Sequence, residues 1–401
     1  IASDAGAIVQ HTTQVVRLGD GEVAVLDREG FRTTTLDAKP IEKEIADVEY
    51  SLEEIELGGF EHYMAKEIFE QPKCLEDSLR GRMRLDDGKI VLGGLAQLSR
   101  EIVRARRIIL TGCGSAWHAC LVGEYLLEEL ARIPVEVEYA SELRYRNPII
   151  EEGAVVIAVS QSGETADTLA AVREVRDKGA MVLGIVNSVG SAIPKETDAG
   201  VYLHVGPEIG VASTKAYTGQ LLVFTLLALY LGRRKNLSEA TLIDYLGALS
   251  KIPDQIQQTL KLSDSIRDAA KDLVSHENWL FLGRGFNYPT ALEGALKLKE
   301  ISYIHAEGMP AAEMKHGPIA LINEGMPVVF VATKNSQHSK IMSNIEEVKS
   351  RGGKVIAIAT EGDTAIAARA DQVFLSRTPW SRCNPCSRWF PSNCWPITRR
   401  Y

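Results

Sequence analysis

The segment Ser160–Thr165 carries side chains suited to binding a phosphate group. Its sequence is Ser-Gln-Ser-Gly-Glu-Thr, after the apolar run 154–159 and before a predicted helix over 165–178. In an open parallel sheet, ligands bind at this junction, because free backbone N–H groups and the positive end of the helix favour anions. The segment therefore predicts a phosphate-monoester site, with an ordinary helix cap at Ser162 as the alternative. The neutral donors are Ser160, Gln161, Ser162 and Thr165.

Lys297 and Glu300 lie three residues apart in an amphipathic segment, so a helix would place them on one face. A carboxylate beside an ammonium group combines a base with an electrophilic partner, which suits proton transfer next to a carbonyl. The same spacing is also typical of a solvated helix surface, and the pattern alone favours that second interpretation.

His316 precedes Gly317 and Pro318, which predict a turn between a helix and a strand. An imidazole there suits acid–base chemistry near neutral pH, and a capping or structural histidine is the alternative. The segment 112–115 is a partial dinucleotide motif, but Trp117 stands where the third glycine belongs, so nicotinamide binding is not indicated. No spacing of histidines and carboxylates indicates a metal site.

These candidates must be positioned by the surrounding elements, and short apolar strands alternate with helical segments from residue 107 onward. The alternation predicts an α/β fold built on parallel sheets with helices on both faces. The first set comprises strands 107–110, 154–159 and 181–186 with helices 119–130 and 165–178. The second set comprises strands 279–282, 327–331 and 354–359 with helices 289–301 and 339–351.

The two sets follow the same order at a nearly constant offset. Gly114 corresponds to Gly285, and Ser160 corresponds to Thr333. These correspondences predict a duplicated α/β domain, with helices over 235–276 joining the copies.

The first 85 residues have a different character. Residues 1–45 are rich in short β segments, and Asp20-Gly21 predicts a hairpin turn between 14–18 and 22–27. They are expected to be the last hairpins of a domain whose front is absent. Residues 46–85 are charged and weakly helical, which predicts a connector.

Composition narrows the class of protein. Forty-five basic and 53 acidic residues leave a net charge of −8, which argues against a nucleic-acid or anionic-membrane surface. The apolar run 221–231 is too short to span a bilayer, so it predicts a buried helix. The six cysteines do not suggest a disulfide framework, which favours a reducing cytosol. Cys383 and Cys386 form a single C-x-x-C pair, for which a metal or redox role is not favoured.

Several motifs together resemble the isomerase part of the glutamine–fructose-6-phosphate aminotransferase family, and the resemblance covers roughly residues 1–375. Residues 1–4 and 62–72 resemble the end of that family's glutaminase domain and the connector after it, and this connector is characteristic of the family among proteins with sugar-isomerase modules. The remaining motifs, in the family's order, are Ser160–Thr168, Glu208–Lys215, Ala291–Tyr303 and His316-Gly317-Pro318.

The resemblance implies two tandem sugar-isomerase (SIS) domains and conversion of fructose 6-phosphate to glucosamine 6-phosphate with glutamine-derived ammonia. It also implies a cytoplasmic homodimer or higher oligomer, without cofactor, metal, nucleic acid or membrane partner. The implied segments are a glutaminase remnant (1–45), a connector (46–85), a first SIS domain (86–234), linking helices (235–266), a second SIS domain (267–375) and an aberrant tail (376–401).

Residue roles follow from the same resemblance. Glu300 is expected to move a proton between C1 and C2, while Lys297 stabilises the enediolate-like intermediate. His316 is expected to assist ring opening, in the site of a neighbouring subunit. The implied sugar-phosphate contacts are Ser160, Gln161, Ser162 and Thr165 at the phosphate, and Ser115, Val211 and Ser213 at the sugar.

The sequence departs from the family pattern at three places. The family's Cys-Gly-Thr-Ser loop is Cys113-Gly114-Ser115-Ala116 here, so Ser115 keeps a hydroxyl and Ala116 loses one. No N-terminal cysteine nucleophile precedes Ile1, so amination by this chain is expected to need free ammonia.

The third departure begins near Ser376, where the resemblance ends and tryptophan and cysteine become frequent. One codon choice for 391–399, shifted in frame, encodes Leu-Gln-Leu-Leu-Ala-Tyr-His-Ala, which resembles the family's final helix. We therefore hypothesise a frameshift, with a natural tail as the alternative. The family's tail supplies a lysine that engages the open-chain carbonyl, and residues 377–401 contain none, so the expectation is an intact phosphate pocket with impaired catalysis.

Two other functions remain open at this point. One is a non-catalytic sugar-phosphate-binding module, which would need neither Lys297, Glu300 and His316 together nor the connector at 62–72. The other is a related deglycase or sugar-phosphate isomerase, a class that usually lacks the glutaminase remnant at 1–45.

Overall fold

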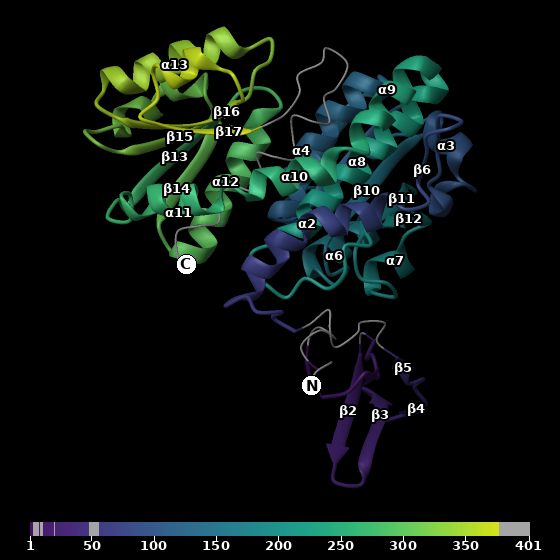
Figure 1. Cartoon of the computed structure of the whole chain (residues 1–401). Helices are drawn as coiled ribbons and strands as arrows, with labels where there is room; N and C mark the ends of the chain where they lie inside the picture. Colours follow the sequence, from purple (N-terminus) through teal and green to yellow (C-terminus); the bar gives the residue numbers. More distant parts are fainter. Residues whose placement is uncertain (3–7, 9–10, 20, 48–55, 377–401) are drawn as a thin grey trace. The chain divides into compact units, whose positions relative to one another are not determined.

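The computed structural model describes residues 1–2, 8, 11–19, 21–47 and 56–376, which fall into two compact units divided at Glu61 (Figure 1). Except for Ser376, the expected frameshifted tail lies outside the described residues, as do Cys383, Cys386 and Cys394.

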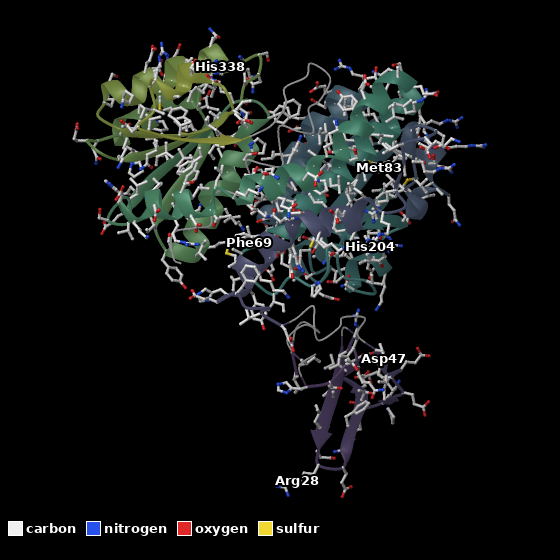
Figure 2. All side chains as sticks on the ribbon, viewed as in Figure 1. Arg28, Asp47, Phe69, Met83, His204 and His338 are labelled. Atoms are coloured by element: carbon white, nitrogen blue, oxygen red, sulfur yellow. The ribbon has the colours of Figure 1, made fainter. Side chains whose placement is uncertain are left out.

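The N-terminal unit consists of short antiparallel strands. The predicted hairpin at Asp20-Gly21 is wrong, because β1 pairs with β5 and β2 pairs with β3. The Asp27 carboxylate accepts hydrogen bonds from the backbone N–H groups of Glu29 and Gly30, at 2.9 and 3.0 Å, and thereby closes the turn that contains Arg28 (Figure 2). The strands are β1 (Gln14–Val15), β2 (Glu22–Asp27), β3 (Gly30–Thr35), β4 (Pro40–Ile41) and β5 (Ala46–Asp47).

The second unit begins with helix α2 (Tyr63–Leu79), which lies in the predicted connector. One face of α2 is buried, and its buried residues recur every three or four positions, as a helix packed on one side requires. After α2 come β6 (Met83–Arg84), β7 (Lys89–Ile90), the 3-10 turn η2 (Gly93–Leu95) and α3 (Ser99–Val103).

The first large sheet is parallel, with strand order β12-β11-β10-β8-β9. Alternate residues face opposite sides: Ile108 and Val155 pack with α4 and α8, whereas Ile109 and Val156 pack with α5, α6 and α7. The strands are β8 (Arg107–Gly112), β9 (Val135–Tyr139), β10 (Ala154–Ser160), β11 (Met181–Val186) and β12 (Ala199–Tyr202). The helices are α4 (Ser115–Leu126), α5 (Ala140–Leu143), α6 (Ala166–Asp177), α7 (Ala192–Glu196) and α8 (Lys215–Lys235), with a π-helical turn η3 (Leu127–Ala131).

Helix α8 confirms the prediction that the apolar run 221–231 is a buried helix. Every residue from Lys215 to Gly232 is buried, and α8 packs against α2 and α4. Gly123 of α4 permits this packing, because a Cβ there would lie 2.7 Å from the Phe224 ring. Among the described residues, no helix is long and apolar enough to cross a membrane.

The second large sheet repeats the first, with strand order β14-β13-β15-β16-β17 and all pairs parallel. Helix α13 packs on one face, and α11 and α12 pack on the other (Figure 1). The strands are β13 (Asn278–Gly283), β14 (His305–Pro310), β15 (Pro327–Ala332), β16 (Lys354–Thr360) and β17 (Gln372–Ser376). The other elements are α11 (Ser263–Lys271), α12 (Asn287–Ser302), η4 (Glu313–His316), η5 (Pro318–Leu321), α13 (His338–Ser350) and α14 (Thr364–Ala367).

The two parallel sheets with helices on both faces were predicted, and the structure confirms them. The duplication extends to the loops: Gly114 and Gly285 follow the first strand of each sheet, and both have positive φ, +57° and +53°. Glycine is favoured at both positions because a side chain is strained at such angles. Helices α9 (Glu239–Leu249) and α10 (Ile252–Leu260) join the copies.

Candidate functional site

The phosphate-site candidate lies where the strand order of the first sheet reverses. The chain runs from β8 to β9 on one side and then crosses to β10 on the other, so the loops after β8 and β10 diverge. Such a switch point leaves a crevice outside the carboxyl ends of the strands, and ligands bind there in open α/β sheets. The loop after β8 contains Ser115, and the loop after β10 is the segment Ser160–Thr165.

The Ser160–Thr165 loop is held by its own hydroxyl groups. The Ser160 Oγ atom accepts a hydrogen bond from the Gly163 N–H at 3.0 Å and lies 3.0 Å from the Thr165 Oγ1 atom. The Ser162 Oγ atom accepts from the Glu164 N–H at 3.1 Å. Thr165 is the N-cap residue of α6, but its side chain makes no capping bond. The loop therefore gathers hydroxyl and N–H groups at a helix N-terminus, which suits an anion.

A second layer supports this loop from the segment after β11. The Gln161 carbonyl accepts a hydrogen bond from the Asn187 N–H at 3.1 Å, and the Gly163 carbonyl accepts from the Ile193 N–H at 2.9 Å. Gly163 has a φ of +69°, and a Cβ there would collide with the Ser191 hydroxyl. Glycine is therefore required at position 163 for both backbone and packing reasons.

The Lys297–Glu300 candidate is an ion pair rather than a solvated helix surface. Lys297 is 2 % exposed, and its Nζ atom lies 2.6 Å from a Glu300 oxygen and 3.3 Å from a Glu293 oxygen. It also donates to the Ser115 Oγ atom at 3.1 Å. Because Ser115 begins α4 and Lys297 belongs to α12, this bond joins the first α/β copy to the second.

Two further residues, Glu293 and His118, belong to the same cluster, and neither was predicted. A Glu293 oxygen accepts from the Ser115 hydroxyl at 2.8 Å, and its other oxygen lies 2.7 Å from His118 Nδ1. The sequence did carry one signal, since Glu293 and Lys297 are four residues apart on α12. His118 carried none, because its partner lies 175 positions away.

Burial and charge set the protonation of this cluster. Burial by itself raises the pKa of Glu293, but Lys297, His118 and Ser115 outweigh burial and bring that pKa below its ordinary value. Burial lowers the pKa of Lys297, but Glu293 and Glu300 outweigh burial and raise it. Burial, aided by the Glu293 charge, raises the pKa of Tyr217 well above its ordinary value. A charged ammonium and a charged carboxylate are therefore held together in the interior.

The two halves of the candidate site meet at the loop after β8. The Cys113 Sγ atom lies 3.7 Å from the Thr168 Oγ1 atom in the first turn of α6, next to the phosphate-site candidate. Two residues further on, Ser115 contacts Lys297. The structure thus places the predicted Ser115 between the predicted anion loop and the predicted proton-transfer pair.

Val211 and Ser213 lie in the loop between β12 and α8. The Val211 side chain is 94 % exposed, and the Ser213 hydroxyl donates to Glu208 at 2.9 Å. Glu208 also accepts from the Thr214 and Ala216 N–H groups, at 2.8 and 3.1 Å, and so caps α8.

His316 stands apart from the cluster within this chain. It lies exposed at the end of η4 and makes no side-chain hydrogen bond or ion pair with the residues that the structure describes. The structure does not bring it to Lys297 or Glu300 of the same chain.

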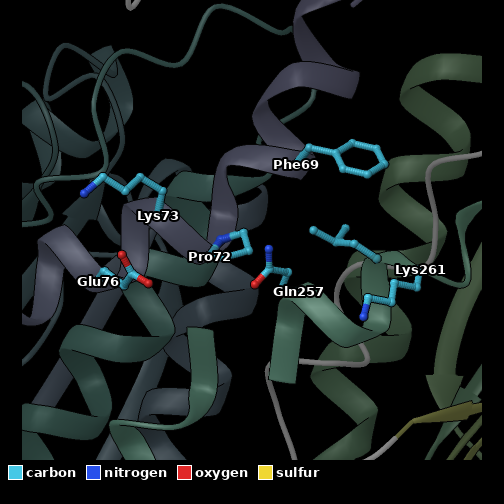
Figure 3. Close-up of a pocket in the computed structure, with 7 residues that line it drawn as sticks. Phe69, Pro72, Lys73, Glu76, Gln257 and Lys261 are labelled. Atoms are coloured by element: carbon cyan, nitrogen blue, oxygen red, sulfur yellow. The ribbon is translucent and has the colours of Figure 1, made fainter. Parts of the chain in front are cut away.

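A separate cavity of about 470 Å³ lies between α2 and α10 (Figure 3). None of the predicted site residues lines it. Its lining residues are Phe69, Pro72, Lys73, Glu76, Gln257, Leu260 and Lys261.

Comparison with known proteins places the chain in a family. Its sequence matches the SIS domain over residues 101–230 and 272–381. It is 55% identical over 373 residues to the glutamine–fructose-6-phosphate aminotransferase (isomerizing) of Chlorobaculum tepidum, and 53% identical over 374 residues to that of Bacteroides thetaiotaomicron. These matches cover 93% and 92% of this chain but only 61% of each relative, so the chain spans less than two thirds of their length.

Solved structures agree with this placement. The C-terminal domain of glucosamine-fructose-6-phosphate aminotransferase from Francisella tularensis superposes with a TM-score of 0.79 at 34% identity, over 86% of this chain and 96% of that one. A tagatose-6-phosphate ketose/aldose isomerase from Escherichia coli shares the fold alone, with a TM-score of 0.66 at 19% identity, over 84% of this chain and 92% of that one. The chain therefore belongs to the SIS domain family, in the group that contains the C-terminal domain of glucosamine-fructose-6-phosphate aminotransferase.

Proposed function

We propose that this chain binds fructose 6-phosphate and carries the isomerase half of its conversion to glucosamine 6-phosphate. Ammonia adds to the C2 carbonyl with loss of water to give an imine, one proton moves from C1 to C2, and the proton of the C1 hydroxyl moves to the imine nitrogen. The product is the 2-amino aldose, so atoms and charge balance without an oxidant or a cofactor. The names of the relatives support this reaction, and the side chains of the candidate site suit each step.

The phosphate of the substrate is assigned to the Ser160–Thr165 loop. Its donors are neutral hydroxyl, amide and N–H groups at the N-terminus of a twelve-residue helix. Such a site binds a dianion without a metal or a buried cation. The hydroxyls of Ser160 and Ser162 exchange part of their internal bonding for the phosphate oxygens, while Gln161 and Thr165 supply further donors.

The proton transfer is assigned to Glu300, with Lys297 beside it. The Glu300 side chain is 30 % exposed, so it is accessible to a sugar, whereas Lys297 is held behind it. The ammonium of Lys297 stays charged because its pKa is raised, and it stabilises negative charge that develops on the substrate oxygen. His316 is assigned to ring opening in a neighbouring subunit's site. This assignment fits its exposure and the fact that it does not contact the Lys297 cluster of its own chain.

One observation carries the proposal: the Lys297 ammonium donates to Ser115, in the loop after β8 that also contacts the first turn of α6 beside the phosphate loop. A binding module without catalysis has no need of a buried Lys–Glu pair at that position, because burying charges costs free energy. This cost favours the enzyme over the non-catalytic alternative.

The remaining partners are proposals of the same kind. Ammonia would come from a glutaminase domain, and the assignment of His316 requires at least a dimer. A cytoplasmic location fits the sugar-phosphate substrate.

Calorimetric titration with fructose 6-phosphate tests the binding assignment. Because each hydrogen bond to a charged group contributes about 1.5–3 kcal/mol, the Ser160→Ala, Ser162→Ala variant is expected to bind at least about a hundredfold more weakly. The matched control is Ser250→Ala, Ser265→Ala, which removes two exposed hydroxyls, one directly after α9 and one in α11, and leaves affinity unchanged. Equal affinity in the phosphate-loop variant, or absence of binding by the unmodified chain, contradicts the proposal.

A further inference from the structure

The loop between β12 and α8 has almost no regular structure of its own. Residues 203–214 contain neither helix nor strand, yet they carry Val211 and Ser213, the candidate sugar contacts. A segment of this kind keeps one shape only if other elements hold it, because its backbone entropy opposes order. The contacts that hold this loop are therefore part of the site's construction.

Helix α2 supplies those contacts from one face. The Glu67 carboxylate accepts hydrogen bonds from the Ile209 N–H at 2.5 Å and the Gly210 N–H at 3.0 Å. Further along α2, the Cys74 thiol donates to the Val205 carbonyl at 3.1 Å. The bonds thus attach both arms of the loop to the helix.

An ion pair between a buried lysine and a half-buried glutamate secures the end of the loop. Lys215, the first residue of α8, donates to Glu70 of α2 at 2.7 Å, and Lys66 approaches the other Glu70 oxygen at 3.2 Å. Glu67, Glu70 and Cys74 are spaced by three and four residues, so they share one face of α2.

The approach of the helix to the loop is close at Gly210. A Cβ at that position would lie 2.6 Å from a Glu67 oxygen and 3.4 Å from the Met64 backbone. Glu67 itself is only 2 % exposed, so its carboxylate is committed to the loop rather than to solvent. The next residue, Val211, is exposed to solvent. The Glu67 hydrogen bonds therefore hold the backbone directly beside a candidate sugar contact.

We propose that α2 is a positioning element of the sugar site, and that Glu67 is its positioning residue, holding the 205–215 loop so that Val211 and Ser213 face the sugar. This inference deepens the proposed function and rests on it for the identity of the sugar. It gives the connector a role in recognising the hexose, separate from the phosphate loop, which α2 does not hold.

Hydrogen exchange measures the positioning without any ligand. In Glu67→Ala, the backbone amides of 209 and 210 are expected to exchange at least about tenfold faster than in the unmodified chain, because their acceptor is gone. In Glu67→Gln, the amide oxygen still accepts, so exchange stays within about twofold. Glu76→Ala removes an exposed carboxylate from the same helix and leaves both amides unchanged. Gly210→Ala perturbs the same contact from the loop side and keeps the test valid if Glu67→Ala does not fold.

Binding assays on the same variants measure the consequence for recognition. Glu67→Ala is expected to weaken fructose 6-phosphate binding about tenfold while leaving inorganic phosphate binding unchanged, and Glu67→Gln is expected to restore the sugar affinity. Unchanged exchange at 209–210 in Glu67→Ala overturns the inference. So does equal loss in the Ala and Gln variants, or a parallel loss of phosphate affinity. Failure of the unmodified chain to bind fructose 6-phosphate refutes the proposed function instead, and the exchange data still decide whether Glu67 positions the loop.

Discussion

At the scale of single residues, the Lys297 cluster shows that burial decides whether a charged side chain belongs to a solvated surface or to a buried ion pair. Lys297 and Glu300 have a spacing found on many exposed helices, and only burial makes the pair exceptional. Glu293 completes the cluster by contacting Lys297, and His118 completes it by contacting Glu293. Each charge is stable because its neighbours offset the cost of desolvation.

Lys297→Met is expected to lower the free energy of unfolding by about 3–5 kcal/mol, because it leaves the Glu293 carboxylate buried without its cation. Urea denaturation at neutral pH measures the change. Adding Glu293→Gln to the same chain removes the unpaired charge and is expected to recover about half of the loss.

Lys299→Met is the matched control, since Lys299 is exposed on the same helix and its loss is expected to change stability by no more than about 0.5 kcal/mol. Equal effects of the changes at 297 and 299 would contradict the buried-pair interpretation.

At the scale of elements, the phosphate-loop candidate depends on a glycine between a strand and a helix. Gly163 adopts a positive φ and lies against Val186, the last residue of β11, and Ser191 in the segment after it. The chain thus turns sharply from β10 into α6, and the hydroxyls of Ser160 and Ser162 are bonded to the loop's own N–H groups.

Gly163→Ala is expected to destabilise the fold by about 1–3 kcal/mol, through both the strained φ and the collision with Ser191, and to weaken phosphate binding. Thermal unfolding and phosphate titration measure the two effects. Gly179, after the other end of α6, also has a positive φ of +85° but has open space where its Cβ would lie. Gly179→Ala is therefore expected to cost only about 1 kcal/mol and to leave phosphate binding intact.

At the scale of the whole molecule, the buried carboxylate of Glu67 makes stability depend on pH. Burial and the nearby Glu208 charge raise its pKa from 4.5 to about 7, although the Gly210 and Ile209 N–H groups and Lys215 act in the opposite direction. The folded chain therefore binds more protons than the unfolded chain between pH 4.5 and 7. The contribution of Glu67 to the free energy of unfolding therefore falls as the pH rises through that interval and is constant above it.

Glu67→Gln is expected to remove this dependence. At each pH, the unfolding free energy of the unmodified chain is subtracted from that of the variant. This difference is expected to be up to about 3 kcal/mol larger at pH 8 than at pH 4. Chemical denaturation at both pH values measures it, and comparing differences cancels the other titrating groups. A difference that is the same at both pH values would contradict the raised pKa.

The regular elements could be predicted because their signals are local. The strand that ends at Ser160, the buried helix over 221–231 and the repeat of Gly114 at Gly285 each follow from apolar periodicity or from a loop residue beside it. The turn at Asp20-Gly21 was mispredicted for the same reason: its local signal favoured a hairpin, but pairing was decided by the Asp27 turn and by partners further along the chain.

The sequence by itself determined which residue types stand at the carboxyl ends of the strands and at the start of α6, because strand and helix boundaries are set by neighbouring residues. Only the tertiary structure decided that Ser115 meets Lys297, that Ser115 and His118 meet Glu293, and that Glu67 holds the loop at Gly210. These contacts join positions more than 140 residues apart. No local periodicity encodes them, because they arise when separate helices pack on the sheets and the desolvated charges find their partners.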